Sequence, residues 1–560
     1  MARPRLRVIP LGGIGEVGKN MMTAEYRGDM VMIDAGAKFP EEEMRGIDLI
    51  IPDISYILQP DNLRRFRAIL LTHGHEDHIG SLPYILPQME RIAPVPLYGT
   101  PLALAFARSR LSEANLAHLA DFMPIEAGRV YRVGSHMDVE FIPVTHSIPA
   151  AMAVSIDTPV GRMLHTGDFK FDPTPPLGPP TDEKRLRELG DEGVLALFSD
   201  AVRVERPGRT PSEATVTATL DRVIGGAKGR VILTSFASNI LRLDQAIKVG
   251  AAHGRKVAVV GRSMEQSVQV AIDLGYITPP PGVLQPVEQV TKLPKNQILI
   301  LTTGSQGEAS AALARMASGD HPKLRITEGD TVVLSATPVP GNEESVSQTI
   351  DSLFRRGANV IYSAIEPSIH VSGHAGRDEL RQMIELLRPK FVVPIHGEYR
   401  HLHLYRELAI DAGVPAESIT IPESGTPISF SRTDMRKEPS APYGAVLVDA
   451  LGNDRYRNVV LRHRDQLATA QVVIATVVVN LERGELIAGP ELTGKGFDDE
   501  DSRLLIEGAE RELRGYLERQ LRKGGMSYGY LVRKVKDIIA RYIYQKSKLR
   551  PMILPVVTEL

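Results

Sequence analysis

The sequence predicts an α/β protein of several domains, and three patterns lead to this expectation. The first 170 residues consist largely of short apolar or alternating runs, which are typical of strands. Residues 194–366 alternate strand-like runs with helix-like stretches, and a smaller mixed segment follows residue 443. The length of 560 residues agrees with several domains, because one domain usually contains about 100–200 residues.

In the N-terminal region, the strand-like runs are β-branched or alternate apolar with polar residues. They lie at residues 5–11, 21–27, 30–36, 67–72, 139–146 and 161–168. Gly28 and Asp29 separate the second run from the third, and this pair of residue types predicts a hairpin turn. This region is therefore expected to consist mostly of strands and turns.

In the middle region, strand-like and helix-like segments alternate. The strands are expected at residues 193–200, 230–236, 256–263, 297–304, 331–338 and 359–366, with helices such as 212–226, 238–254 and 342–358 between them. This alternation predicts a parallel sheet with helices on both faces, in a domain of its own. A helix at residues 381–389 then leads into a further strand at 390–398.

The C-terminal part begins after a stretch that reads as a linker. Residues 432–443 contain two prolines and several charges, which favours an irregular connection. Beyond it we expect strands at 471–479 and 551–560 and helices at 502–522 and 529–546. Residues 501–560 hold 13 Lys or Arg against 7 Asp or Glu, so this segment either faces RNA or supports assembly, or simply has a solvated basic face.

Composition excludes several classes of protein and site. The chain has 66 basic and 68 acidic residues, so its net charge of −2 does not by itself indicate nucleic-acid binding. It has no Cys, which excludes disulfides, Cys nucleophiles and zinc sites built on thiolates. No signal peptide and no apolar run of membrane-spanning length is apparent, so we expect a soluble cytoplasmic protein without a membrane partner.

A glycine-rich stretch at residues 13–20, GIGEVGKN, matches GxGxxG and nearly matches a phosphate loop. Both nucleotide-binding patterns require a helix directly afterwards. Here two strand-like runs follow, and Asn20 replaces the Ser or Thr that would hold magnesium. We therefore expect a tight loop near another site rather than a nucleotide site.

The strongest functional signal is HxHxDH at residues 73–78, directly after an expected strand. His73, His75, Asp77 and His78 are four potential metal ligands within six residues, although the whole chain has only 15 His. One ion is not easily surrounded by all four, so the spacing favours two. His146 and Asp168, each at the end of an expected strand, are further candidates.

The order Asp34, HxHxDH, His146, Asp168, His396 resembles the five motifs of the metallo-β-lactamase superfamily. The α/β region between Asp168 and His396 resembles the insertion of its β-CASP subgroup, which acts on nucleic acids. Five further features resemble bacterial ribonuclease J over essentially the whole chain. They are HVSGH at 370–374, residues 199–213, TSFASN at 234–239, TTGSQGE at 302–308 and the C-terminal α/β segment. Ala201 and Val202 depart from the family's usual SDST sequence after Asp200.

The resemblance implies an αββα metallo-β-lactamase sandwich with an inserted parallel β-CASP domain and a small C-terminal α/β domain. The corresponding segments are 1–206 and 370–431 for the lactamase domain, 207–369 for the β-CASP domain, 432–456 for a linker and 457–560 for the C-terminal domain. It also implies two Zn²⁺ per subunit, with Mn²⁺ or Mg²⁺ as substitutes. One ion would be held by His73, His75 and His146, the other by Asp77, His78 and His396, and Asp168 would bridge them.

Further roles follow from the same resemblance. Asp77, His374 and Asp200 are the implied catalytic residues, with His374 either protonating the leaving group or stabilising a phosphoryl oxygen. Asp34 would orient a metal-binding His without touching metal. A pocket for a 5′ monophosphate would be formed by residues 370–374, which are His370, Val371, Ser372, Gly373 and His374, together with Ser235 and Ser238. Helix capping is the alternative role for the two serines. Asp48 and Asp449 are weaker candidates for a structural cation site.

The implied function is a two-metal ribonuclease that degrades single-stranded RNA from the 5′ end and also cuts internally. Its substrate would preferably carry a 5′ monophosphate, its role would be bacterial mRNA decay and RNA maturation, and it would form a homodimer or homotetramer. Two other functions stay open from the sequence: a β-CASP nuclease that acts on DNA or only internally, and a non-catalytic RNA-binding scaffold. A hydrolase of small esters is disfavoured by the insertion and by HVSGH.

Overall fold

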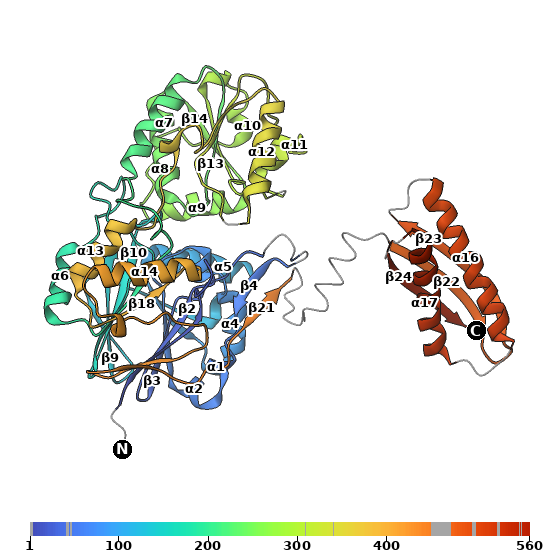
Figure 1. The fold of residues 1–560 in the computed structure, drawn as a ribbon. Coiled ribbons are helices and arrows are strands. Elements are labelled where there is room, and N and C mark those ends of the chain that lie inside the picture. The colour runs from blue at the N-terminus through green and yellow to red at the C-terminus, as the bar shows by residue number, and fades with distance from the viewer. Residues whose placement is uncertain are drawn as a thin grey trace. The chain divides into compact units, whose positions relative to one another are not determined.

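The computed structural model describes residues 4–40, 44, 47–308, 310–339, 341–449, 472–495, 500–522, 527–547, 549 and 551–560. The chain divides into two compact units. The larger comprises Met1–Phe39 with Leu49–Val448, and the smaller comprises Pro40–Asp48 with Asp449–Leu560 (Figure 1). Both units mix strands and helices, so the predicted α/β class is confirmed.

Two β-sheets pack against each other in the larger unit. The eight-stranded sheet has the order β20 (Met435–Lys437), β19 (Ile428–Phe430), β1 (Leu6–Gly12), β2 (Met21–Tyr26), β3 (Asp29–Ile33), β5 (Phe66–Leu70), β6 (Val95–Gly99), β7 (Ala120–Pro124). The six-stranded sheet has the order β18 (Phe391–Ile395), β12 (Ala196–Asp200), β11 (Gly161–His165), β10 (Ala151–Thr158), β9 (Met137–Val144), β8 (Val130–Val133). The hairpin predicted at Gly28 joins β2 and β3, which pair antiparallel.

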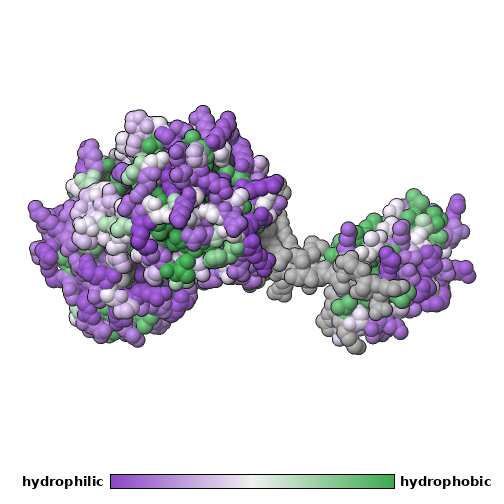
Figure 2. All heavy atoms as spheres, turned by 90° about the horizontal axis from the view of Figure 1, so that it is seen from above, coloured by the Kyte–Doolittle hydropathy of each residue, from purple (hydrophilic) through white to green (hydrophobic). Residues whose placement is uncertain are grey.

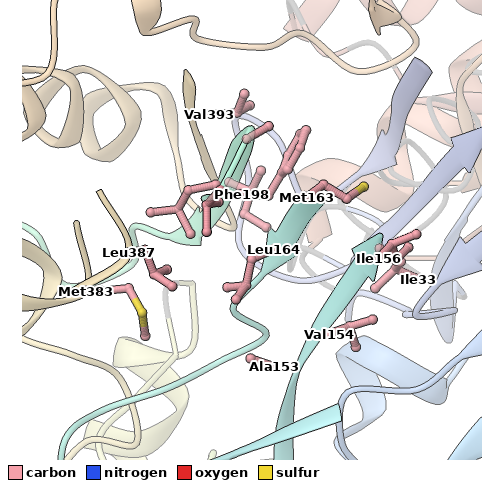
Figure 3. Packing of buried hydrophobic residues seen from close by; sticks show 14 of the residues in the cluster. Ile33, Ala153, Val154, Ile156, Met163, Leu164, Phe198, Met383, Leu387 and Val393 are labelled. Atoms are coloured by element: carbon pink, nitrogen blue, oxygen red, sulfur yellow. The ribbon is translucent and has the colours of Figure 1, made fainter. Parts of the chain in front are cut away.

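The alternation of side chains along the strands explains why these sheets stack. In β3, Val31 and Ile33 belong to the cluster shared with the six-stranded sheet, whereas Met30 and Met32 pack in a second cluster on the opposite face. Figure 3 shows part of the shared cluster, including Ile33 of the first sheet and Ile156 of the second. The apolar side chains on each sheet face are thus removed from water. This burial is the main driving force for the arrangement.

Helices cover the outer faces and complete the αββα sandwich. Those beside the eight-stranded sheet are α1 (Ser55–Leu58), α2 (Pro60–Arg65), α3 (Glu76–Ile79), α4 (Leu82–Ile85) and α5 (Pro101–Glu113). Those beside the six-stranded sheet are α6 (Glu183–Glu192), α13 (Arg377–Leu387) and α14 (Tyr399–Asp411). Met383 and Leu387 of α13 pack in the same cluster as Leu164 of β11 (Figure 3).

The inserted region forms a five-stranded sheet in which all neighbouring strands are parallel. Its order is β14 (Lys256–Val260), β15 (Ile298–Thr302), β13 (Val231–Thr234), β16 (Thr331–Leu334), β17 (Asn359–Ile361). The helices are α7 (Ala214–Gly226), α8 (Ile240–Ala252), α9 (Arg262–Asp273), α10 (Val287–Val290), α11 (Ala312–Ser318) and α12 (Glu343–Arg355). Consecutive residues of β13 enter separate clusters on the two faces of the sheet, as Ile232 and Leu233 do. Helices therefore cover both faces, as predicted.

Two short strands extend the larger unit into the stretch predicted as a linker. β20 pairs with β19, and β21 (Ala445–Val448) pairs antiparallel with β4 (Leu49–Pro52). The paired chain therefore continues beyond residue 431, where the sequence predicts the linker to begin. Runs of three or four residues carry too little periodicity to be recognised among prolines and charges. Residues 450–456 lie outside the described part of the chain.

The smaller unit contains a three-stranded sheet and two long helices. The sheet has the order β23 (Glu485–Lys495), β22 (Val472–Asn480), β24 (Met552–Glu559), and the helices are α16 (Glu500–Leu521) and α17 (Tyr528–Ser547). Val473, Val477, Leu513 and Ile539 are among the residues of its separate core. The predicted strands and helices of this segment agree with these elements, whereas β23 was not predicted.

The surface accords with the balanced composition. Figure 2 shows hydrophilic residues over most of the visible face of the larger unit, with hydrophobic residues scattered among them. None of the helices in the described part of the chain is both long enough and apolar enough to cross a bilayer.

A buried ion pair joins α8 of the inserted region to Glu213, the residue that directly precedes α7. The guanidinium of Arg242 is fully buried and lies 2.8 Å from Oε2 of Glu213, which is buried to the same degree. Arg242 also donates to the carbonyl oxygen of Ile369 at 3.1 Å and to the hydroxyl of Ser335. Because Ile369 directly precedes His370, this network holds the start of the HVSGH loop.

We expect Arg242→Ala to lower the free energy of unfolding of the larger unit by about 3–5 kcal/mol, because it leaves the Glu213 carboxylate buried without its charge partner. Urea denaturation followed by circular dichroism measures this change. Arg222→Ala is the matched control, since Arg222 is 63% exposed in its pair with Glu366 and should cost less than about 1 kcal/mol. Equal stability of the two variants would contradict the structural role of the buried pair.

Candidate metal centre

The predicted ligands meet because, within each sheet, the strands that precede them run in the same direction. In the six-stranded sheet, β9, β11, β12 and β18 are all parallel to one another, and they lead into His146, Asp168, Asp200 and His396. In the other sheet, β3 and β5 are parallel and lead into Asp34 and the HxHxDH segment. The carboxyl ends of parallel strands meet at one edge, which is the usual place for a site in an α/β sheet.

The HxHxDH segment changes conformation midway, and this change distributes its ligands. His73 follows the end of β5, and His75 is an extended residue (φ −74°, ψ 153°) that immediately precedes α3. Asp77 and His78 then lie in the first turn of α3, so they project differently from the two preceding histidines. The segment thereby contributes to two neighbouring groups of ligand atoms, as its spacing suggests.

The first group consists of His73, His75 and His146. Nδ1 of His75 lies 3.0 Å from Nε2 of His73 and 3.2 Å from Nε2 of His146. Nδ1–H of His146 donates to the carbonyl oxygen of Gly373 at 2.8 Å, which leaves Nε2 free to accept or to bind metal. Three imidazole nitrogens at these distances fit one face of a metal site.

The second group consists of Asp77, His78, Asp168 and His396. Nε2 of His78 is 3.3 Å from Oδ2 of Asp168 and 3.5 Å from Oδ2 of Asp77. Nε2 of His396 is 3.6 Å from Oδ2 of Asp77. Oδ2 of Asp168 also lies 3.8 Å from Nε2 of His73, so this one carboxylate is next to both groups.

Burial and charge divide the histidines into two kinds. Burial lowers the pKa of His75 to about 4, and it holds the pKa of His73 and His146 well below the usual range, so these rings are neutral. Burial also acts on His78 and His396, but the carboxylates of Asp168 and Asp77 outweigh it and raise the pKa of both. The acidic half of the centre therefore attracts protons strongly, and a divalent cation would satisfy the same carboxylates.

These residues fit a centre for two divalent cations. The seven side chains of the two groups supply imidazole nitrogens and carboxylate oxygens, the donors that zinc and manganese accept, and none requires sulfur. Each group brings its donor atoms within 4.8 Å of one another. The predicted division of ligands between two ions, with Asp168 between them, is compatible with this arrangement.

Asp34 supports the second ligand group through hydrogen bonds. Its Oδ2 accepts from Nδ1–H of His78 at 2.7 Å and from the hydroxyl of Thr72 at 2.8 Å, while Oδ1 accepts from the backbone N–H of Thr72 at 2.8 Å. Asp34 has a positive φ of 60°, a conformation that Asp adopts more readily than most residues. The carboxylate fixes the ring of His78 with Nε2 directed toward the ligand group, as expected for an orienting residue.

We expect Asp34→Ala to weaken divalent-metal binding by about 10–100-fold, because the ring of His78 loses the partner that orients it. Calorimetric titration of the metal-free protein with Zn²⁺ or Mn²⁺ measures this change. Asp29→Asn is the control, since Asp29 is a buried aspartate at the start of β3, the strand that precedes Asp34, and binds Arg67 and His136 instead. Wild-type affinity in Asp34→Ala would refute the orienting role.

His374 and Asp200 form a pair beside the metal ligands. Nδ1 of His374 lies 2.7 Å from Oδ2 of Asp200, and Nε2 lies 4.0 Å from Oδ2 of Asp168. Burial lowers the pKa of His374, but Asp200 and Asp168 outweigh it and raise the pKa to about 9. His374 therefore holds a proton at Nε2 facing the centre. It also lies within ligand distance of His146 and Asp168, so geometry alone leaves a metal-binding role open.

The HVSGH loop reaches the centre through Gly373. A Cβ at this position would lie 2.5 Å from the ring of His146, so only glycine permits the observed approach. The sequence places this glycine in the expected phosphate pocket, and the structure places it against the ring of His146, a predicted metal ligand. Ser372 accepts from the backbone N–H of His374 at 3.2 Å, and Nδ1 of His370 is buried without a hydrogen-bond partner.

Electrostatics around His370 favour a negative ligand. Burial lowers its pKa to about 3, and the positive charges of Arg242, Lys170 and Arg203 add to this effect. The buried Nε of Arg203 has no hydrogen-bond partner either. Unsatisfied polar groups are costly when buried, so their presence here is consistent with a polar or anionic ligand.

Two other predicted groups have separate environments. The hydroxyl of Ser235 donates to the carbonyl oxygen of Ser335 at 3.3 Å, which links it to the network that holds Ile369. Ser238 does not cap α8, because Asn239 is the capping residue. Asp48 directly precedes β4 and is exposed, while Asp449 directly follows β21 and is buried. Neither belongs to a group of three or more ligand side chains among the described residues, and the cation site stays a prediction.

The structure also places near the centre a residue that the sequence reasoning did not select. The amide of Asn20 lies within 3.4 Å of side-chain atoms of Asp77, His78 and His396. The glycine-rich stretch is followed by β2, not by a helix, so its predicted position as a tight loop near another site is correct. The sequence signal available for Asn20 was that a polar residue stands at the end of a loop expected near another site.

Comparison with known proteins identifies four segments by family description. Residues 15–233 match the metallo-beta-lactamase superfamily, and residues 228–353 match the ribonuclease J beta-CASP domain. Residues 359–419 match the Zn-dependent metallo-hydrolase RNA specificity domain, and residues 459–560 match the ribonuclease J C-terminal domain.

Similarity to individual proteins extends over the whole chain. It is 39% identical to ribonuclease J2 of Bacillus subtilis over 99% of this chain and 98% of the relative. It is 40% identical to ribonuclease J 1 of Streptococcus pyogenes, over 98% and 97%, and 39% identical to ribonuclease J of Synechocystis, over 98% and 86%. A crystal structure of a protein of unknown function from Enterococcus faecalis covers 76% of this chain with a TM-score of 0.52 and 18% identity, which concerns the fold alone. That match includes 100% of the solved chain.

Proposed function

This chain belongs to the ribonuclease J family of metal-dependent ribonucleases, and from that premise we propose how its clustered side chains cut RNA. The observation that carries the proposal is that two groups of ligand side chains meet at Asp168. Beside them lies the pair of His374 and Asp200, two residues that flank the inserted region in the sequence. The reaction is hydrolysis of a phosphodiester bond in single-stranded RNA, both from the 5′ end and internally.

The proposed metal ligands are those of the two groups. His73, His75 and His146 would hold one Zn²⁺, Asp77, His78 and His396 would hold the other, and the Asp168 carboxylate would serve both, with Mn²⁺ or Mg²⁺ as substitutes. Two divalent ions in such a centre lower the pKa of water and neutralise the charge of the phosphate under attack. Asp34 and Gly373 orient His78 and His146 through the hydrogen bonds described above.

His374 is the proposed proton donor. Asp200 accepts from Nδ1–H and fixes the ring, so the proton on Nε2 faces the reacting phosphate and passes to the oxygen of the leaving group. The raised pKa of His374, about 9, supports a protonated ring at neutral pH. The alternative for the same geometry is that Nε2–H stabilises a phosphoryl oxygen without transferring its proton.

The HVSGH loop is the proposed pocket for a 5′ monophosphate, together with Ser235 and Ser238. Support comes from the unpartnered Nδ1 of His370 and from the cations of Arg203 and Lys170 near it. Because the same loop carries His374, a phosphate bound there would lie a fixed distance from the scissile bond. Such an arrangement favours removal of single nucleotides from the 5′ end.

The wider role proposed for the protein is RNA decay and maturation in the bacterial cytoplasm. The match to an RNA specificity domain and the relatives' names support RNA as substrate. The smaller unit, which matches the family's C-terminal domain, is proposed to support a homodimer or homotetramer. Binding of RNA through phosphate should weaken as salt rises.

Product sizing on end-labelled RNA tests the function. The same oligonucleotide is offered with a 5′ monophosphate or a 5′ hydroxyl, each labelled at the 3′ end, alongside a DNA of equal sequence. We expect progressive shortening from the 5′ end, faster for the monophosphate, and little cutting of DNA. Equal rates with only internal fragments would refute the exonuclease and its pocket. Binding without cutting by the metal-loaded protein would favour the scaffold.

A further inference from the structure

The glycine-rich loop between β1 and β2 is built into the metal centre. The backbone N–H of His396 donates to the carbonyl oxygen of Gly13 at 2.8 Å, and Ile14 forms a β-bridge with Gly397. At the other end of the loop, the backbone N–H of Asn20 donates to the carbonyl oxygen of Asp77 at 3.0 Å. The loop therefore connects the segments that carry two ligands of the second group.

The side chain of Asn20 points into that group. Its Nδ2 atom lies 3.1 Å from Nε2 of His78, 3.4 Å from Nε2 of His396 and 3.3 Å from Oδ2 of Asp77. The residue is only 9% exposed. One atom of Asn20 thus lies at similar distances from all three ligand atoms proposed for the second ion.

These separations are those of donor atoms around a single cation. Zinc binds nitrogen and oxygen at about 2.0–2.2 Å, so two donors at right-angled or tetrahedral positions lie about 3.0–3.5 Å apart. The amide atom of Asn20 satisfies this relation to Asp77, His78 and His396 simultaneously. The same separations also suit hydrogen bonds from an amide N–H group, so the charge of the occupant decides between the two.

Electrostatics decides which end of the amide faces the ligands. The nitrogen and oxygen of an Asn side chain have nearly the same shape, so their assignment follows from their hydrogen-bond and charge environment. With a cation held by Asp77, His78 and His396, the positive hydrogens of an NH₂ group would be repelled, whereas a carbonyl oxygen is attracted. Rotation by half a turn about the last side-chain bond exchanges the two ends.

We propose that Oδ1 of Asn20 is an additional ligand of the second divalent cation, the one held by Asp77, His78 and His396. The inference rests on the proposed metal centre. Glycines make room for this amide: a Cβ at Gly13 would lie 2.3 Å from its outer end, and a Cβ at Gly36 would lie 2.6 Å from the backbone nitrogen of Asn20. The glycine-rich pattern that resembles a nucleotide loop thereby serves to place an oxygen donor.

Metal binding by four variants of the full-length protein tests the proposal without reference to activity. Asn20→Ala removes the amide, Asn20→Leu keeps its branched shape without polar atoms, and Asn20→Asp keeps an oxygen at the same position. Asn62→Ala is the control, because Asn62 is 7% exposed and donates to the Tyr56 carbonyl instead of contacting a ligand. Each metal-free protein is titrated calorimetrically with Mn²⁺, and circular dichroism checks its fold.

We expect two Mn²⁺ per chain in the wild type and the control. Asn20→Ala and Asn20→Leu should weaken one of the two binding steps by about tenfold or more and leave the other unchanged, while Asn20→Asp should bind as tightly as the wild type or tighter. Wild-type affinity in Asn20→Leu would overturn the ligand role. So would weakened binding in Asn20→Asp, which would indicate that the N–H groups matter. A wild type that binds no divalent cation would instead overturn the metal centre itself.

Discussion

Replacing Asp168 with alanine is expected to abolish RNA cleavage and to release metal from both positions of the centre. Oδ2 of Asp168 lies 3.3 Å from Nε2 of His78 and 3.7 Å from Nε2 of His146, and Oδ1 is 2.7 Å from Nδ1 of His396. Asp168 belongs to the group with Asp77, His78 and His396 and also to a group with His146 and His374. Its loss removes negative charge that holds two cations together, so the rate should fall by about a thousandfold or more.

The measurement combines metal analysis of the purified variant with initial rates on labelled RNA. Asp157→Ala is the matched control, because Asp157 lies in β10 of the same sheet but pairs with Arg162 away from the ligands, and its side chain is 46% exposed. The control should retain metal and activity. An Asp168→Ala protein that kept both ions, or that cut RNA at a rate near the wild type, would contradict the bridging role.

The contrast between HxHxDH and Asn20 shows how far local sequence information reaches. Four residues of metal-binding types within six positions indicate a metal site, because one short turn of the chain is enough to bring them together. His396 is 228 residues beyond Asp168, and no local pattern relates the two. Their contact depends on β11, β12 and β18 being parallel neighbours, which the family resemblance implies and residue spacing alone does not.

Asn20 and Gly373 illustrate what could not be predicted. The loop at residues 13–20 was expected near another site, but its partner segments follow β5 and β18, and neither adjacency is written in the loop itself. The sequence places Gly373 in the expected phosphate pocket, and its close approach to the ring of His146 is visible only in the structure. In both cases the sequence shows the residue type, but the residue that it contacts follows a strand far away in the sequence.

Replacing His374 with alanine is expected to separate chemistry from metal binding. The variant should retain both ions, because the seven proposed ligands remain, and should lose about 10²–10⁴-fold in turnover, the usual contribution of a positioned acid or base. Asp200→Asn should give a smaller loss, since the ring remains but its orienting carboxylate is gone. Metal analysis and single-turnover rates on 5′-monophosphorylated RNA measure both effects. Loss of metal from His374→Ala would show that this residue is a ligand instead.

A change in the leaving group distinguishes the two roles left open for His374. In an RNA whose bridging leaving oxygen is replaced by sulfur, the departing thiolate needs no proton, because thiols have a pKa of about 8.5, far below that of a ribose hydroxyl. If Nε2 of His374 protonates the leaving group, His374→Ala should cut this RNA at nearly the wild-type rate. If Nε2–H only stabilises a phosphoryl oxygen, the defect should persist undiminished, because the charge on that oxygen develops whichever atom departs. Asp168→Ala should remain inactive on both substrates, since sulfur does not replace a lost metal ligand.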